Sequence, residues 1–262
     1  MVSMKKRIFT GAGVAIVTPM YEDGSINWDT YGQLIDWQIA NGTDAIIVCG
    51  TTGESATLND EEHVESIRFV TEKVAGRVPV VAGAGSNDTA YAIKLAKDAA
   101  AIGVDGLLLV TPYYNKTSQR GLVAHFNAIA AATDLPIILY SVPSRTGVNI
   151  LPATCQELAK HPNIVAIKEA SGNMEQVAKI KALCGDQLDI YSGEDSLIVP
   201  VMSVGGIGVI SVLSNVVPKE THEICQLYLD GKTGESAALY LKYLELASAL
   251  FSDVNPIPVK EA

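Results

Sequence analysis

The sequence predicts an α/β fold, a (β/α)8 TIM barrel followed by a short helical extension. Eight short apolar runs rich in β-branched residues can be marked, and helical patterns separate most of them. The strand starts recur at roughly 18–34 residue intervals, as alternating βα units do. This alternation indicates a parallel sheet covered by helices, and eight units favour closure into a barrel.

Each expected strand is an apolar run bounded by turn-forming residues. In chain order the eight runs are Gly13–Thr18, Asp44–Cys49, Val78–Gly83, Gly106–Thr111, Pro136–Ser141, Ile164–Lys168, Asp189–Ser192 and Gly206–Val212. Helices are expected between them at Asp29–Asn41, Asn59–Val74, Asp88–Ile102, Gln119–Thr133, Pro152–His161 and Asn173–Leu183. An open doubly wound sheet would want a dinucleotide fingerprint after the first strand, but Gly11-Ala12-Gly13 precedes that strand.

After the eighth run the chain becomes helical at Pro218–Asp230 and Gly234–Phe251, with Gly231 as the stop between the two helices. Another helix can begin at Pro256, because proline suits the first turn of a helix. We expect residues 1–231 to form the catalytic barrel and residues 232–262 to form a partial C-terminal helical region.

Composition narrows the class of protein. The formal net charge of −10 argues against binding to a nucleic-acid backbone, which needs a basic footprint. No apolar stretch is long enough to span a bilayer, so a soluble cytoplasmic protein is expected. The four cysteines are far apart and form no CxxC pair, which predicts neither a zinc site nor a disulfide framework. No metal and no cofactor are expected.

Lys168 is an unusual residue for its strand, the almost wholly apolar segment Ile164–Ala170. Charged side chains are rarely buried without a partner, and burial lowers the pKa of a lysine. A partly neutral lysine is a nucleophile that forms a Schiff base with a carbonyl substrate. The alternatives are that Lys168 points into water or pairs with Glu169.

Polar residues follow several other strands, and a barrel of this type carries its active site at the C-terminal strand ends. They are the segments Gly50–Ser55, Thr111–Asn115, Tyr140–Gly147, Ser192–Asp195 and Gly205–Gly208. Each has a plain alternative: a simple turn at Thr51-Thr52, packing by Tyr113-Tyr114, or a solvated Arg145. The last glycine-rich segment could instead hold phosphate, and Glu194-Asp195 could be a metal pair, although no histidine is placed to complete it.

Together these residues describe a metal-free aldolase. An imine of lysine and a carbonyl compound withdraws electrons, so that the adjacent carbon becomes an enamine nucleophile. A tyrosine hydroxyl can move the protons that imine formation requires. Hydroxyls and backbone amides can hold one carboxylate, and arginine suits a second. The sequence therefore favours condensation of a keto acid with a carboxylated partner.

In combination, the segments Gly50–Glu54, Thr111–Asn115, Tyr140–Gly147 and Ile167–Ala170 resemble the dihydrodipicolinate synthase family of pyruvate-dependent class I aldolases. The resemblance covers about Gly11 to Lys260. It implies that Lys168 is the Schiff-base lysine and that Tyr140 acts as acid and base. Thr51 and Thr52 would take part in the proton relay and in substrate binding, and Tyr114 would complete the relay in a neighbouring subunit. Arg145 would bind the second carboxylate, and Gly193 and Ile210 would line the pocket.

The resemblance implies condensation of pyruvate with L-aspartate 4-semialdehyde to 4-hydroxy-tetrahydrodipicolinate, a step of diaminopimelate and lysine biosynthesis. Arg145 favours this activity over that of relatives such as N-acetylneuraminate lyase, which are not expected to have the Pro-Ser-Arg-Thr turn. A catalytically silent barrel that only binds keto acids is a further alternative, but such a protein needs no lysine nucleophile.

The resemblance also carries two departures. Members of the family usually continue past the Asn255–Lys260 segment by about a further helical pair, so the C-terminal extension looks truncated and the expected homodimer or homotetramer is put in doubt. Lysine-inhibited relatives line an allosteric cleft with histidine and glutamate, besides residues matching Ser55, Ala56, His63, Asn87 and Tyr113. Here Asp60 and Tyr91 stand at the histidine and glutamate positions. Weak or absent inhibition by lysine is expected.

Overall fold

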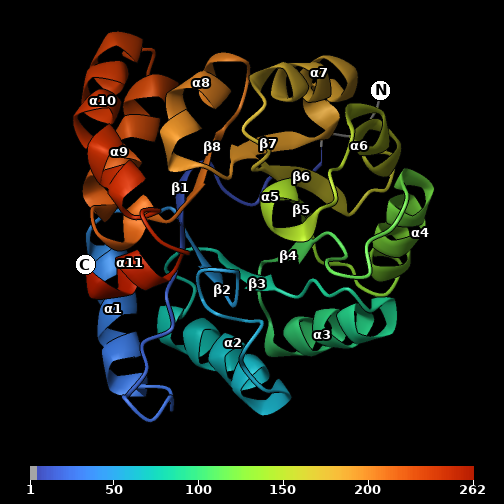
Figure 1. Ribbon diagram of the computed structural model, residues 1–262, viewed down its shortest axis with the longest axis horizontal. Coiled ribbons are helices and arrows are strands. Elements are labelled where there is room, and N and C mark those ends of the chain that lie inside the picture. The colour runs from blue at the N-terminus through green and yellow to red at the C-terminus, as the bar shows by residue number, and fades with distance from the viewer. Residues whose placement is uncertain (1–4) are drawn as a thin grey trace.

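The computed structural model describes residues 5–262, and its eight parallel strands close into one barrel (Figure 1). Each strand pairs with its neighbour in the sequence, and β1 pairs with β8 to close the ring. The predicted (β/α)8 fold is therefore confirmed. The strands are β1 Gly11–Ala15, β2 Ala45–Val48, β3 Val80–Gly83, β4 Gly106–Val110, β5 Ile137–Ser141, β6 Ile164–Glu169, β7 Asp189–Ser192 and β8 Gly208–Ser211.

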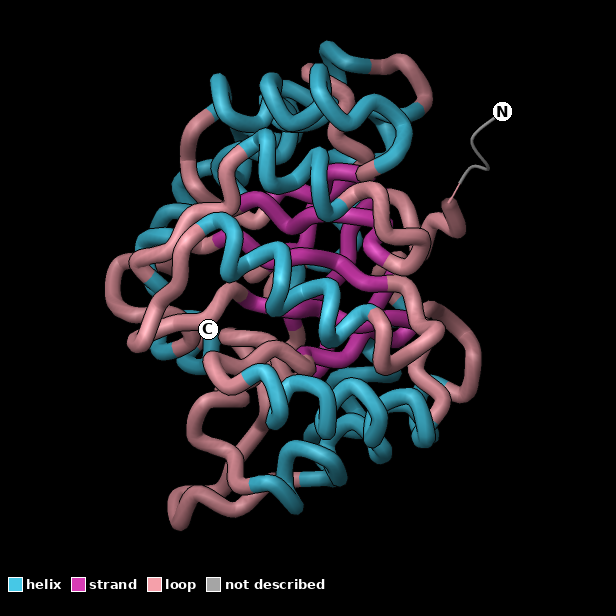
Figure 2. Tube along the Cα trace, turned by 90° about the vertical axis from the view of Figure 1, so that its right-hand side faces the viewer, coloured by secondary structure: helices cyan, strands magenta, loops and turns pink. Residues whose placement is uncertain are grey.

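The helices surround the barrel, with the strands enclosed between them (Figure 2). They are α1 Trp28–Ala40, α2 Asp60–Val74, α3 Thr89–Ile102, α4 Gln119–Ala130, α5 Pro143–Thr146, α6 Pro152–Leu158, α7 Met174–Cys184, α8 Ile198–Ser203, α9 Pro218–Leu229, α10 Thr233–Ala249 and α11 Ile257–Glu261. Short 3-10 turns lie at η1 Gly185–Gln187, η2 Asp195–Leu197 and η3 Leu213–Asn215. Within residues 5–262, every helix is too short or too polar to serve as a transmembrane span.

Two expectations about glycine-rich segments are wrong. β1 begins at Gly11 rather than Gly13, because Gly11 pairs in register with Gly208 of β8. A Cβ on Gly208 would lie 1.9 Å from the Gly11 carbonyl oxygen, so the two backbones approach as only glycine permits. The same register puts Gly205 and Gly206 before the start of β8, at the end of the barrel opposite the predicted rim. They cannot hold a phosphate beside Lys168.

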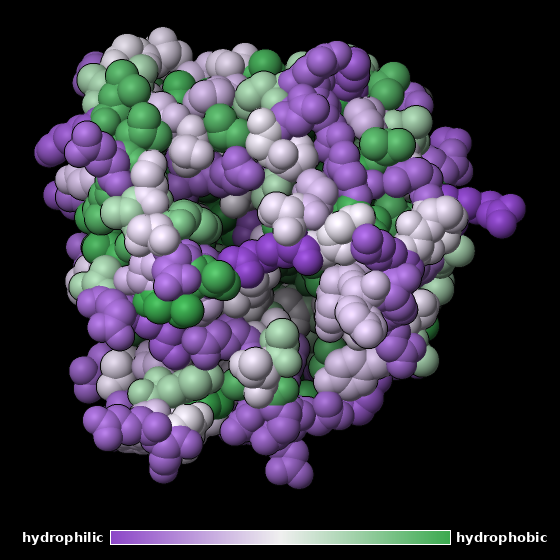
Figure 3. Space-filling view, in the orientation of Figure 1, coloured by the Kyte–Doolittle hydropathy of each residue, from purple (hydrophilic) through white to green (hydrophobic). Residues whose placement is uncertain are grey.

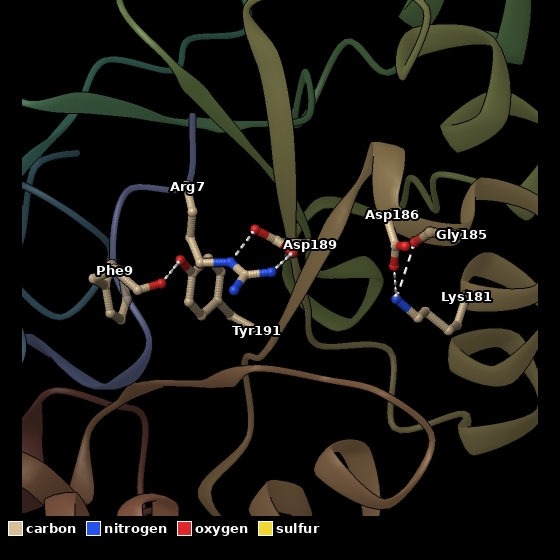
Figure 4. Close-up of polar contacts among 7 residues, drawn as sticks. All are labelled: Arg7, Phe9, Lys181, Gly185, Asp186, Asp189 and Tyr191. Carbon is tan, nitrogen blue, oxygen red and sulfur yellow. Dashed lines mark hydrogen bonds and ion pairs between the residues drawn. The ribbon is translucent and has the colours of Figure 1, made fainter. Parts of the chain in front are cut away.

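The barrel interior is filled with side chains away from its open rim. Phe9 stacks on Tyr191 of β7 with ring centroids 4.4 Å apart, and the Tyr191 hydroxyl donates to the Phe9 carbonyl oxygen at 2.6 Å (Figure 4). Beside this pair, Arg7 and Asp189 form a two-point ion pair with a shortest distance of 2.9 Å (Figure 4). A substrate must therefore enter at the C-terminal strand ends, where the face in Figure 3 is hollowed near its centre.

The loop after β2 is held by a capped helix. Asn59 Oδ1 accepts from the Glu62 backbone N–H at 3.0 Å, and Glu62 Oε2 accepts from the Asn59 backbone N–H at 3.0 Å. This capping box satisfies two backbone donors at the start of α2 and fixes where that helix begins. The Gly50–Ser55 turn thus lies between a buried strand and a fixed helix start.

Candidate active site

Lys168 points into the barrel interior from β6. The residue is 5% exposed, and its strand register places it beside Tyr140 of β5 on one side and Tyr191 of β7 on the other. The Lys168 ammonium lies 4.3 Å from the centroid of the Tyr140 ring. Because adjacent strand residues face opposite sides, Glu169 points outward, where its carboxylate accepts from Gln176 Nε2 at 2.8 Å. Both alternatives for Lys168, exposure to water and pairing with Glu169, are wrong.

A cavity of about 460 Å³ opens over Lys168. Six of the residues singled out in the sequence line it, and they come from the ends of β2, β5, β6 and β7: Thr51, Thr52, Tyr140, Arg145, Lys168 and Gly193. A cavity of this size suits a small molecule, and convergent polar groups at one wall are typical of a catalytic site. The predicted convergence on the rim holds for these six residues.

The turn that carries Thr51 and Thr52 adopts strained backbone conformations. Cys49 and Glu54, on either side of it, have positive φ angles of 53° and 59°. Gly53 packs so closely that an added Cβ would lie 3.2 Å from the Ile16 carbonyl oxygen. Strained backbone of this kind clusters at active sites. The turn brings Thr52 into the cavity wall, where it is buried.

Arg145 projects from α5, the single helical turn after β5. The residue is exposed and lines the cavity, and its Nη2 donates to the Asn255 carbonyl oxygen at 3.1 Å. A guanidinium has five N–H donors, so most remain available for a carboxylate. Arg145 is therefore held at the cavity rather than free on a surface loop.

Two predicted residues lie outside this cavity. Ile210 is buried in β8 within the apolar cluster of the barrel interior that includes Tyr140, and it is not among the described residues of the cavity wall. Tyr114, after β4, is 92% exposed and has a φ of 68°. It does not line the cavity within the described part of this chain. Its strained, outward-facing position leaves the ring available to another molecule.

Two further polar residues belong to the site: Asp195, which the sequence suggested only as half of a metal pair, and Asn255, to which it gave no role. Asp195 is buried at the cavity wall, where its Oδ2 accepts from the backbone N–H groups of Val212 and Leu213 at 3.0 and 2.9 Å. Burial raises the pKa of the Asp195 carboxyl; hydrogen bonding by the β8 end and its following turn opposes that shift, and the positive charge of Lys168 opposes it least. Asn255 donates from Nδ2 to Thr52 Oγ1 at 3.1 Å across 203 residues of chain. No local pattern could reveal a contact between such distant segments.

A second cavity of about 490 Å³ shares Thr51, Val142 and Arg145 with the first. Its wall brings together most of the residues expected for the lysine cleft: Ser55, Ala56, Asp60, His63, Tyr91 and Tyr113. The remaining one, Asn87, donates to the Tyr113 carbonyl oxygen at 3.2 Å. Within residues 5–262, no group of three side chains is arranged to hold a metal ion.

Comparison with known proteins agrees with this geometry. Residues 8–262 match the Dihydrodipicolinate synthetase family. The chain belongs to this family. The resemblance seen in the sequence is thereby confirmed over nearly the whole chain.

Individual members of the dihydrodipicolinate synthetase family are similar over nearly the same span. A 4-hydroxy-tetrahydrodipicolinate synthase of Caldicellulosiruptor saccharolyticus is 59% identical over 255 residues, which cover 97% of this chain and 86% of that protein. One from Lachnoclostridium phytofermentans is 60% identical over 256 residues, covering 97% and 87%. The crystal structure of the Acinetobacter baumannii enzyme complexed with pyruvate has a TM-score of 0.95 at 42% identity, covering 96% of this chain and 87% of that chain.

Proposed function

We propose that the protein condenses pyruvate with L-aspartate 4-semialdehyde to give 4-hydroxy-tetrahydrodipicolinate, in diaminopimelate and lysine biosynthesis. The observation that carries the proposal is the buried Lys168, which forms no ion pair among residues 5–262 and lies beside Tyr140 in a cavity that also contains Arg145. The names of the relatives support the same reaction.

In the first stage, Lys168 Nζ attacks the keto carbon of pyruvate, and loss of water gives the imine. Tyr140, whose ring lies under the ammonium, moves protons to and from the departing oxygen, with the Thr51 and Thr52 hydroxyls as relay partners. Removal of a proton from the pyruvate methyl group then leaves an enamine, because the imine nitrogen accepts the electron pair.

In the second stage, the enamine carbon attacks the aldehyde of aspartate semialdehyde while Arg145 binds its carboxylate through charge-assisted hydrogen bonds. The amino group of that substrate then adds to the imine carbon, which frees Lys168 and closes the ring. One water leaves in total, from the first imine formation. The chemistry needs a nucleophilic amine, proton carriers and a carboxylate anchor, all of which line this cavity.

Tyr114 has a separate proposed role. We infer that its exposed ring enters the site of a second subunit and completes the proton relay there, so the active form is a homodimer or homotetramer. We also propose that the enzyme works in the cytoplasm. Sedimentation of the protein and of the Tyr114→Phe variant tests the assembly, and turnover by that variant, which keeps the ring but lacks the hydroxyl, tests the relay. Full activity of a protein that sediments as a monomer would contradict it.

A coupled assay distinguishes the proposed function from its alternatives. Purified protein is given pyruvate with aspartate semialdehyde and, in parallel, N-acetylneuraminate. Turnover of the first pair alone supports the synthase activity. Cleavage of N-acetylneuraminate would identify a lyase instead, and binding of pyruvate without turnover of either would identify a silent keto-acid-binding barrel.

A further inference from the structure

Asn255, just before α11, contacts two residues of the proposed active site. Its side-chain Nδ2 donates to Thr52 Oγ1 at 3.1 Å, and its carbonyl oxygen accepts from Arg145 Nη2 at 3.1 Å. We propose that Asn255 is a positioning residue whose amide directs the Thr52 hydroxyl proton into the cavity over Lys168. The inference rests on the proposed function, because it assigns Thr52 a part in proton transfer.

The contact is made by a well-anchored segment. Asn255 is buried, and Arg145 holds its backbone from the other side. Four residues further on, Val259 packs in an apolar cluster that includes Val212 and Leu213 beyond β8. Lys260 then pairs with Glu54 at 3.1 Å, in the same turn that carries Thr52. The distance between Asn255 and Thr52 is thus fixed from both sides of the hydrogen bond.

The side chain of Asn255 has no other polar role among the described residues. Its Oδ1 is buried and accepts no hydrogen bond within residues 5–262, and its Nδ2 donates to Thr52 alone. Leaving a buried acceptor unpaired costs free energy, and exceptions of this kind in folded proteins call for an explanation. The Asn255 side chain is thus held by its Nδ2 contact with Thr52, while its Oδ1 stays unpaired.

The direction of that hydrogen bond has a chemical consequence. A threonine hydroxyl has one hydrogen to donate and lone pairs to accept. When Oγ1 accepts from Asn255, its own hydrogen must point elsewhere, and Thr52 otherwise faces the cavity that contains Tyr140 and Lys168. The hydroxyl is therefore set to donate toward the substrate and the proton relay, as preorganised catalysis requires.

Two substitutions separate this role from simple packing. Asn255→Asp keeps the size of the side chain, but at about pH 8 its carboxylate only accepts hydrogen bonds, so it turns the Thr52 proton away from the cavity. Asn255→Ala removes the side chain and leaves Thr52 free to rotate. A positioning role predicts greater harm from aspartate, whereas a packing role predicts greater harm from alanine.

The experiment measures the rate at which saturating pyruvate forms a borohydride-trappable imine, per folded protein as determined by circular dichroism. We expect Asn255→Asp to slow it about tenfold or more and Asn255→Ala less. In a Thr52→Val background both changes should have effects within about twofold of none, because the hydroxyl they act through is absent. Ser252→Ala, at a nearby exposed position, is the matched control and should trap like wild type.

Two results would overturn the inference while leaving the proposed function intact: alanine more harmful than aspartate, or an aspartate effect that persists at full size in the Thr52→Val background. The second result would mean that the added charge acts on the site directly. Failure of the wild-type protein to be trapped at all would be different, since it would overturn the proposed function and this inference with it.

Discussion

The two cavities share a wall but differ in how their polar groups are satisfied. Over Lys168, the ammonium contacts the face of an aromatic ring, and Asp195 Oδ1 is buried with no hydrogen-bond partner among residues 5–262. In the second cavity, the Tyr91 hydroxyl donates to Asp60 Oδ1 at 2.6 Å, and Lys94 lies 3.4 Å from Asp60 Oδ2. In the first cavity the Lys168 ammonium has no ion-pair partner among residues 5–262 and one oxygen of Asp195 is unpaired, whereas in the second cavity both oxygens of Asp60 are engaged by neighbouring side chains.

This difference indicates which cavity performs chemistry. Folded proteins rarely leave buried polar groups unpaired, and a catalytic role is one of the reasons for an exception. In the second cavity the hydrogen bond from Tyr91 lowers the pKa of the Asp60 carboxyl, with a smaller contribution from Lys94. A carboxylate engaged in this way has less to offer an incoming ammonium group.

The largest expected effect comes from removing the lysine itself. Lys168→Ala should lower turnover by on the order of 10⁴-fold, because no other nucleophile replaces it. A coupled assay measures the loss, and Lys94→Ala, which alters the edge of the second cavity, is the matched control. Comparable losses in the two variants would remove the distinction between the cavities.

Arg145 lies in the shared wall and should act mainly on the second substrate. Arg145→Ala should lower kcat/KM for aspartate semialdehyde by at least about a hundredfold, since a charged partner of a carboxylate is lost. Borohydride trapping with pyruvate should still occur and should slow far less, through the lost contact between Arg145 and the Asn255 carbonyl oxygen. Steady-state kinetics beside trapping separates the two steps. An equal loss of trapping would undo the role assigned to Arg145.

The second cavity should respond weakly to lysine. We expect less than half-inhibition at sub-millimolar lysine, because Asp60 is already bonded and tyrosine occupies position 91. Tyr91→Glu, which adds a carboxylate to the cleft, should increase lysine binding as measured by calorimetry. Strong inhibition of the wild-type protein would show that the bonded Asp60 does not weaken the cleft.

The smallest effect concerns the scaffold away from both cavities. His222 of α9 bonds through Nδ1 to Asp44 Oδ2 at 2.8 Å, and this hydrogen bond raises the pKa of His222. Because the pKa of His222 is higher in the folded protein than in the unfolded chain, its bond to Asp44 stabilises the fold fully below the ordinary histidine pKa. That stabilisation is lost as pH rises through the folded-state pKa of His222.

His222→Asn should therefore lower Tm by about 1–3 °C more at about pH 5.5 than at about pH 8.5. Calorimetry of both proteins at the two pH values measures the difference, while the rate of imine trapping at one fixed pH should stay unchanged. A Tm difference that does not depend on pH would mean that the ion pair contributes nothing to the folded state.

The barrel and most of its site could be predicted because they depend on local patterns. Apolar runs fix the strands, and the fold rule brings Thr52, Tyr140, Arg145 and Lys168 to one rim once the strands are assigned. Two features could not be predicted in this way. The start of β1 depends on a close backbone approach between Gly11 and Gly208. These residues belong to β1 and β8, which pair only when the barrel closes.

The contact between Asn255 and Thr52 is the other such feature. It joins a segment near the end of the chain to the loop after β2, and it depends on how α10 and α11 pack against the rim. Asp195 was visible as a polar residue after β7. Its position as a buried acceptor of two backbone N–H groups from the turn after β8 required the folded structure.

The most direct test of the account is to locate the covalent intermediate. The protein is reduced with borohydride in the presence of pyruvate, digested and analysed by mass spectrometry. We predict one reduced pyruvyl group, on the peptide that contains Lys168, and none in Lys168→Ala. A label on another lysine, or no label on a folded wild-type protein, would contradict the assignment of Lys168 as the Schiff-base nucleophile.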